Sequence, residues 1–296
     1  MRSKTSQYLY YIIIVFVGFY ILFKFYEIFA ESLFITAPDR INILLYGPET
    51  YYYSLDRANN RDYAIAFQPD VKVDVPGGYG TYRVGSLGKL ALLDDDPELI
   101  KNTFALTTTT FVHFVFLEHT DEVYYGEKIP EIQKPPLKKI LFSTSNASIL
   151  DRLYLALILF DDKADGYQLI SFLEQKEEVF DDISFENELF FKDSIGLLFQ
   201  ETYRDEHESI QVLYPGKYAT AQRISDLLEG NGIRVSDISY DISKHKTCEV
   251  VYSSDSKSHT ARDIGSYFGC SVSPGKTDVY DILFLLGGVE EKWKVN

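Results

Sequence analysis

The chain has 296 residues, which is enough for about two domains of ordinary size. Its 44 acidic and 29 basic residues leave a net charge of −15, and this excludes nucleic acid as a favoured partner, because binding phosphates needs a basic face. Two Cys and one Met argue against a disulfide-dense scaffold and a Cys-based zinc module. The net charge is +1 over residues 1–37, −4 over 38–150, −11 over 151–209 and −1 over 210–296.

The N-terminal region is apolar. Residues 8–23 read YLYYIIIVFVGFYILF without a charge, and apolar character continues to Ala30. About 20 such residues cross a bilayer as a helix, and Arg2 and Lys4 favour an N-terminus inside the cell. We therefore expect a single-pass membrane protein held by residues 8–30, with a cytoplasmic N-terminus and the bulk of the chain outside the cytoplasm.

Two alternatives to this signal anchor stay open. A signal peptide cleaved at Ala30 is one, although Ile28 is bulky for the position two residues before a cut. A buried core helix is the other, although no polar face appears at any period. An uncleaved anchor is the preferred interpretation.

Residues 38–209 predict a β-rich α/β unit followed by an acidic helical part. Alternating or continuous apolar runs predict strands, and apolar spacing of three and four residues predicts helices. A Pro- and Lys-rich loop is expected over 119–140, a helix over 149–160 and amphipathic helices within 161–209. The strands are expected over 42–47, 63–67, 71–75 and 111–117, and the earlier helices over 84–92 and 98–105.

The C-terminal residues alternate strands with helices, which is typical of a compact α/β domain. Cys248 and Cys270 each stand at the start of a predicted strand. If those strands are parallel neighbours, a disulfide is geometrically possible outside the cytoplasm, and two buried thiols are the alternative. Strands are expected over 210–214, 233–238, 248–252 and 281–286, and helices over 221–228 and 261–268.

Several short motifs have a structural interpretation that competes with a functional one. Gly77 to Gly80 (GGYG) lacks the following Lys-Ser/Thr of a phosphate loop and favours a turn. Asp94 to Asp96 suits a hard divalent cation, but also a solvated helix cap. The five His are scattered, so no metal site is predicted. Asn146-Ala147-Ser148 matches a glycosylation sequon.

The stretch from Ile210 to Val235, IQVLYPGKYATAQRISDLLEGNGIRV, resembles the LytR cell-envelope-related C-terminal domain. That family opens with a V-x-V-L-N strand, a small-residue turn and an A-x-x-x-A-x-x-L helix, followed by G-x-x-V. Tyr214 stands here in place of the usual Asn. The resemblance covers about 85 residues and includes the apolar strand before Gly287-Gly288.

The upstream part resembles a shortened LytR–CpsA–Psr domain through its signal anchor and the strand Asn42 to Gly47 (NILLYG). This resemblance implies transfer of a glycopolymer from a lipid pyrophosphate carrier to the cell wall, with arginines, acidic residues and magnesium at the pyrophosphate. The family's R-x-D-T is matched by Asn60-Arg61-Asp62-Tyr63 and its P-R-D-T by Pro69-Asp70 alone. The remaining candidates are Arg61, Asp62 and Arg83 as catalytic residues, and Arg57 and Asp70 as ligand-binding residues.

Because the family's later arginine-rich segment has no counterpart within 151–209, the sequence favours a non-catalytic binding or scaffold protein of the cell envelope, without a cofactor. Its expected partners are a cell-wall glycan or an envelope protein. A divergent, magnesium-dependent phosphotransferase is the alternative. The expected fold is α/β, with a transmembrane helix in residues 1–37, a LytR–CpsA–Psr-like mixed-sheet domain over 38–205 and a small α/β sandwich over 206–296.

Overall fold

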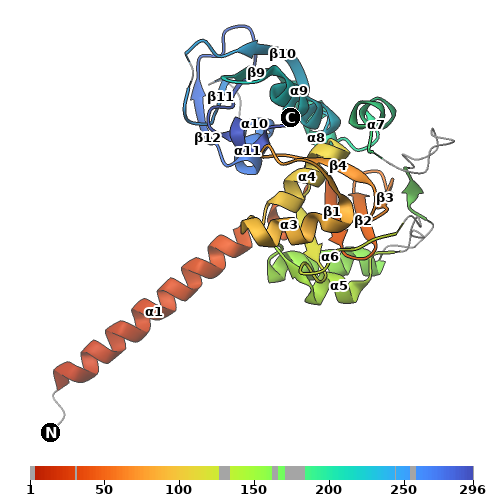
Figure 1. Cartoon of the computed structure of the whole chain (residues 1–296). Helices are drawn as coiled ribbons and strands as arrows, with labels where there is room; N and C mark the ends of the chain where they lie inside the picture. The colour runs from red at the N-terminus through yellow and green to blue at the C-terminus, as the bar shows by residue number, and fades with distance from the viewer. Residues whose placement is uncertain are drawn as a thin grey trace.

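A computed structural model describes residues 4–30, 32–126, 134–161, 166–170, 184–243, 245–253 and 258–295. A long N-terminal helix projects from a body that contains two α/β units (Figure 1). Each unit is built on one main mixed sheet. The predicted α/β class with mixed sheets is therefore confirmed. Parts of the predicted loop (127–133) and of the acidic segment (162–165 and 171–183) lie outside the described residues.

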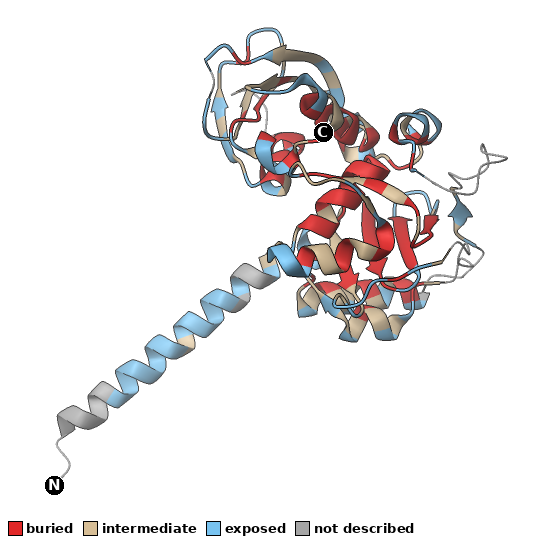
Figure 2. Ribbon diagram, viewed as in Figure 1, coloured by how far each residue is buried: buried red, intermediate tan, exposed pale blue. Residues whose placement is uncertain are grey.

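The helix α1 spans Lys4–Ala30, and its described side chains from 10 to 24 are almost all exposed (Figure 2). Within the described part of the chain, no helix has both the length and the apolar character needed to cross a membrane. The prediction of a transmembrane helix is therefore wrong for this structure.

The first unit contains a six-stranded sheet in the order β7-β6-β1-β2-β3-β8. The central strand β1 pairs antiparallel with β2 and parallel with β6. The strand β2 was not predicted, because Thr50, Ser54 and Asp56 interrupt its apolar residues and leave neither an alternation nor a continuous apolar run. The strands are β1 Arg40–Tyr46, β2 Thr50–Asp56, β3 Tyr63–Phe67, β6 Phe114–Leu117, β7 Thr144–Ser145 and β8 Gln168–Leu169.

Helices cover both faces of this sheet. Along β1, Ile43 and Leu45 face one layer, whereas Leu44 and Tyr46 face the other, as the alternation of a strand requires. The first layer holds α2 Leu33–Thr36, α5 Leu137–Phe142 and α6 Ile149–Asp161. The second layer holds α3 Leu87–Asp94 and α4 Leu99–Thr108.

A separate hairpin joins β4 Lys72–Val75 to β5 Gly80–Arg83. Its turn includes Gly77 and Gly78, with φ of 86° and 82°, a left-handed region that glycine enters without steric cost. GGYG is therefore a turn, as the sequence favoured. It leads into a strand and then the short 3₁₀ turn η1 Val84–Ser86, rather than directly into a helix.

The second unit contains a five-stranded sheet in the order β10-β9-β13-β11-β12. Its helix α9 packs the predicted apolar stripe, which includes Ile224 and Leu228, into the core. The strands β11 and β12 are parallel neighbours, and the residues just before them, Cys248 and Cys270, form a disulfide. The elements are β9 Ser209–Tyr214, α9 Tyr218–Gly230, β10 Arg234–Tyr240, β11 Glu249–Ser253, α10 His259–Phe268, β12 Ser271–Gly275, β13 Ile282–Leu285 and α11 Val289–Trp293.

The two units share one hydrophobic core, which continues from the β1 sheet through α4 and α9 into the second sheet. Phe111 stacks on Tyr267 with ring centroids 4.2 Å apart. Gly230 lies so close to the first unit that an added Cβ would stand 1.9 Å from the carbonyl oxygen of Thr109. The connecting helices α7 Asn187–Ser194 and α8 Glu201–Glu206 run along this junction, so the units are packed as one body.

Candidate functional site

The sequence-derived candidates fall into two groups at opposite ends of β3. Arg57, Arg61 and Asp62 lie on the connection from β2 to β3, where the carboxylate of Asp62 accepts a hydrogen bond from the backbone N–H of Asp56 at 2.7 Å. The Arg57 guanidinium lies 5.1 Å from the centre of the Tyr154 ring. Arg61 is exposed.

The second group contains Asp70 and Arg83. A guanidinium nitrogen of Arg83 lies 3.7 Å from the Asp70 carboxylate, and the other carboxylate oxygen accepts the backbone N–H of Gly126 at 2.9 Å. Asp62 precedes β3 and Asp70 follows it, so at about 3.3 Å per residue the two groups stand roughly 16 Å apart. The structure does not bring Arg61, Asp62 and Arg83 together around one pyrophosphate-sized site.

The other motifs have structural roles. Asp95 is the left-handed C-cap of α3, and Asp96 accepts the backbone N–H of Glu98 at 3.0 Å. The Asn146 side chain bonds the N–H of Val115 and the carbonyl of His113, so the sequon asparagine is engaged in joining β7 to β6. Within the described ranges, no group of three or more His, Cys, Asp or Glu is placed to hold a metal ion.

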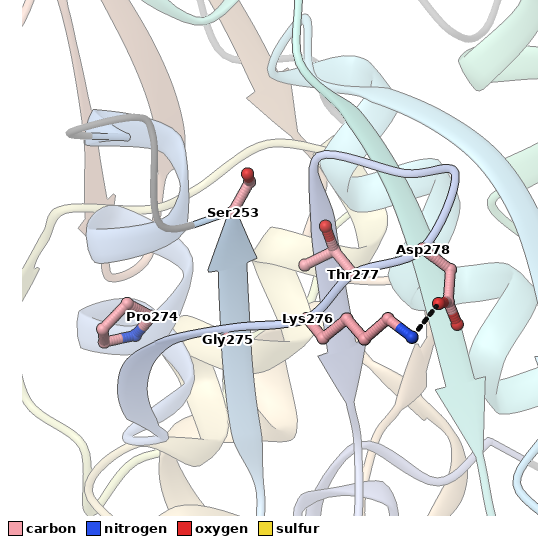
Figure 3. A pocket seen from close by; sticks show the side chains of 6 residues that line it. All are labelled: Ser253, Pro274, Gly275, Lys276, Thr277 and Asp278. Carbon is pink, nitrogen blue, oxygen red and sulfur yellow. Dashed lines mark ion pairs between the residues drawn. The ribbon is translucent and has the colours of Figure 1, made fainter.

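Two hollows are candidates for a ligand site. The smaller one, of about 540 Å³, lies where β11 and β12 end (Figure 3). Its charged pair joins Lys276 to Asp278 at 3.6 Å, but the two side chains are 91% and 76% exposed. An ion pair so open to water contributes little energy and fixes little geometry. This hollow is the weaker candidate.

The larger hollow, which we call the junction cleft, has a volume of about 790 Å³ and lies between the two units. It brings together segments that are far apart in the sequence: the end of α1 with α2, one residue of α4, the chain before β6, the start of α8 and the exposed side of α10. Its lining is Ala30, Leu33, Ile35, Thr36, Ala37, Pro38, Lys101, Phe111, Val112, His113, Phe114, Gln200, Thr202, Tyr203, His259, Arg262, Asp263, Ser266 and Tyr267.

Aromatic rings and cations meet in this cleft. The Lys101 ammonium lies 5.1 Å from the centre of the Tyr267 ring and 3.1 Å from a carboxylate oxygen of Glu98. Arg262, which is exposed, places a guanidinium nitrogen 2.6 Å from Nδ1 of His259. Because a guanidinium can only donate, Nδ1 of His259 is the acceptor. The cleft therefore offers positive charge beside aromatic surface.

His113 is held as a neutral imidazole. Its Nδ1 accepts the backbone N–H of Asn42 at 3.0 Å, which places the ring proton on Nε2. Burial, reinforced by the charge of Lys101, lowers the pKa of His113 to about 4. At neutral pH the side chain is therefore an uncharged hydrogen-bonding group in the cleft.

The acidic groups of this region are committed to protein partners. The hydroxyl of Tyr203 donates to Asp263 at 3.0 Å, and burial raises the pKa of both groups. The Glu206 carboxylate accepts the N–H groups of His259 and Thr260, each at 2.8 Å, at the start of α10. Although burial opposes ionisation, these bonds and one from the Thr260 hydroxyl lower the pKa of Glu206.

Sequence reasoning did not find the junction cleft. Its residues come from five separate segments, and no spacing motif links them. The available signals were indirect: the aromatic content near 111–114 and the C-terminal residues from 259 to 267 were assigned to the cores of two different units. Only the tertiary contact between the units places Phe111 against Tyr267.

The fold defines a two-unit α/β protein with a shared core and an aromatic, cationic cleft at the junction. No protein-family model matches the sequence, and no curated protein or solved structure shows a significant match to it. The resemblance to the LytR-related families therefore stays a prediction.

Proposed function

We propose that this chain is an extracytoplasmic binding protein of the cell envelope, and that its junction cleft holds an acidic glycan. The observation that carries the proposal is the meeting of the cations Lys101 and Arg262 beside the Tyr267 ring in one hollow of about 790 Å³. Guanidinium and ammonium groups bind carboxylate or phosphate substituents, and ligand hollows combine apolar walls with a few placed polar groups.

The disulfide supports a position outside the cytoplasm, because such bonds persist in oxidising compartments. The resemblance of residues 210–235 to an envelope-associated domain family points the same way.

A binding role fits the cleft better than transfer chemistry does. The hydroxyl of Thr202 donates to Asp39, and the hydroxyl of Tyr203 donates to Asp263. The Nδ1 atom of His113 already accepts the backbone N–H of Asn42. These contacts hold the cleft walls in place. The arginine and aspartate candidates for a phosphotransferase are divided between the two ends of β3, so no observation favours that alternative.

Retention of the purified full chain on isolated cell wall tests the proposal. Two wall preparations are compared, one that retains its anionic polymers and one from which they have been stripped. We expect retention on the first to exceed retention on the second several-fold, and Arg262→Gln to reduce it about tenfold.

Arg234→Gln is the matched control, because Arg234 is also exposed but lies on β10, outside the cleft lining. Equal retention of wild type and Arg262→Gln would contradict the role of the cleft. The absence of retention on either wall preparation would contradict the proposed function itself.

A further inference from the structure

The outer face of α6 carries an apolar stripe. Ile149, Leu153, Leu157 and Phe160 are 77%, 47%, 62% and 80% exposed, and their spacing of four, four and three residues places them on one side of the helix. The opposite side is buried through Leu155 and Leu159. Figure 2 shows exposed and intermediate residues along the outer sides of α5 and α6. We call this set, together with Phe142 of α5 (79% exposed), the α6 stripe.

A continuous row of exposed apolar side chains is unusual on a protein surface that contacts only water. Single exposed apolar residues are common, but a continuous row on one helix marks an interaction surface. The other side of α6 already packs on the sheet, and the carboxylate of Asp151 on that helix accepts the backbone N–H of Leu33 at 2.8 Å. The stripe therefore faces outward in the folded chain, with α6 fixed beneath it.

The charge around the stripe has the opposite sign to that of the chain. From residue 134 to the end of α6 at Asp161 the chain contains four basic and two acidic residues, a net of +2 in a chain whose net charge is −15. Asp151 is 7% exposed, and one of the four cations, Lys139, pairs with Glu118 at 2.6 Å. Lys138, on the same hairpin of helices, is exposed. The stripe is thus an apolar row within the cationic part of an acidic molecule.

We propose that the α6 stripe rests on the surface of an anionic lipid bilayer. A helix that presents Ile, Leu and Phe on one face, with lysine at its margin, has the composition of a helix that lies in the bilayer interface. Anionic head groups attract the surrounding cations. A second copy of the chain is disfavoured as the occupant, because a symmetric contact would bring two identical cationic surfaces together.

A fluorescence experiment with the full chain tests this placement. Phe160→Trp and Phe142→Trp report from the stripe, and Val279→Trp, at a position that is 84% exposed in the second unit, is the control. The single native Trp293 is 2% exposed and gives a constant background. Vesicles of phosphatidylcholine and phosphatidylglycerol contain phosphatidylcholine brominated on its acyl chains, which quenches only fluorophores that enter the apolar layer.

We expect strong quenching and a blue shift for the two stripe variants, and neither for Val279→Trp. The quenching reports only on tryptophans placed in the stripe. Binding of the chain to vesicles through another segment therefore leaves these tryptophans unquenched and does not support the proposal. Stripe variants that stay unquenched while the chain sediments with the vesicles would overturn the proposal. A blue shift that depends on protein concentration without vesicles, with dimers in sedimentation, would also overturn it in favour of a second copy.

The contribution of charge is tested separately. Lys138→Glu in the Phe160→Trp background removes one cation and adds one anion near the head groups. At about 1 kcal/mol per basic residue near an anionic surface, the loss of the cation alone reduces affinity about fivefold. Lys276→Glu, in the second unit and 91% exposed, is the matched control. Equal affinities of the two charge variants would contradict the orientation proposed here.

Discussion

The side-chain carbonyl of Asn231 accepts the backbone N–H of Phe111 at 3.0 Å, across the junction between the two α/β units. The Asn231 amide nitrogen donates to the carbonyl of Leu227 at 2.7 Å, which fixes the side chain at the end of α9. Both residues are buried. One asparagine therefore joins the helix of the second unit to the strand region that leads into β6 of the first.

We expect Asn231→Ala to lower the free energy of unfolding by about 1–3 kcal/mol, because it leaves the Phe111 N–H buried without a partner. Denaturant unfolding measures the change. Gln222→Ala, which removes a side chain at the partly buried outer side of α9, is the control and should cost less. If Asn231→Ala had the same free energy of unfolding as the wild type, the hydrogen bond across the junction would make no net contribution to stability.

The neutral state of His113 makes stability depend on pH. Its pKa is lowered to about 4 in the folded chain, against about 6.5 in an unfolded one. Between these values the unfolded state binds more protons, so the stabilising contribution is complete above pH 6.5 and is lost as the pH falls toward 4. The complete loss, below pH 4, is about 3.4 kcal/mol.

His113→Asn tests this dependence, because the Asn carbonyl retains an acceptor without titrating. Unfolding free energies are compared at pH 7.5, 5.5 and 4.5. Carboxylates contribute to both proteins alike, so the wild type should lose more stability than the variant over this interval. Parallel pH profiles for the two proteins would show that His113 is not held neutral.

Arg40 and Asp56 form an ion pair of 2.7 Å with side chains that are 3% and 7% exposed. The same guanidinium donates to the hydroxyl of Ser54 and to the carbonyl of Phe199. Arg40→Ala should cost about 3–5 kcal/mol, because Asp56 is left as a buried charge without its partner.

Arg40→Ala/Asp56→Ala is the control for this loss and should be less destabilising than Arg40→Ala alone. The double variant and the two single variants, Arg40→Ala and Asp56→Ala, are measured by denaturant unfolding. A double variant as unstable as the sum of the two single variants would indicate that the residues act independently.

The disulfide closes a loop with a sequence separation of 22 residues. Loop-closure entropy for such a length predicts that Cys248→Ser/Cys270→Ser lowers the unfolding free energy by roughly 3 kcal/mol. Reduction of the wild type should produce a similar loss, and reduction of the double variant none. Unfolding with and without a thiol reductant checks this. A reductant effect on the double variant would point to a cause other than this bond.

Much of the order of helices and strands was predictable, because an element that buries one side has apolar residues at regular spacing in the sequence. The stripe of α9 and the apolar core of β1 were visible as spacing and as a continuous run. The strand β2 is buried on both faces as β1 is, but Thr50, Ser54 and Asp56 interrupt its apolar residues, so no continuous run marks it. The helix α5 begins inside the predicted loop over 119–140 and ends just beyond it, and its six residues are too few to show a helical period.

The candidate site was much less predictable. Arg61 and Arg83 were linked through a resemblance, and the chain places them at different ends of β3. The junction cleft depends on contacts such as Phe111 with Tyr267, which are separated by more than 150 residues. Local periodicity identifies which side of each element is buried, but it does not identify which buried sides meet.

The close approach of Gly230 to Thr109 has a consequence for comparing this chain with others. A side chain at position 230 would collide with backbone, which cannot move aside as the end of a flexible side chain can. A related protein with any other residue at this position must therefore hold its two sheets in a different mutual orientation. The identity of this one residue separates relatives that share the junction cleft from those that share only the separate sheets.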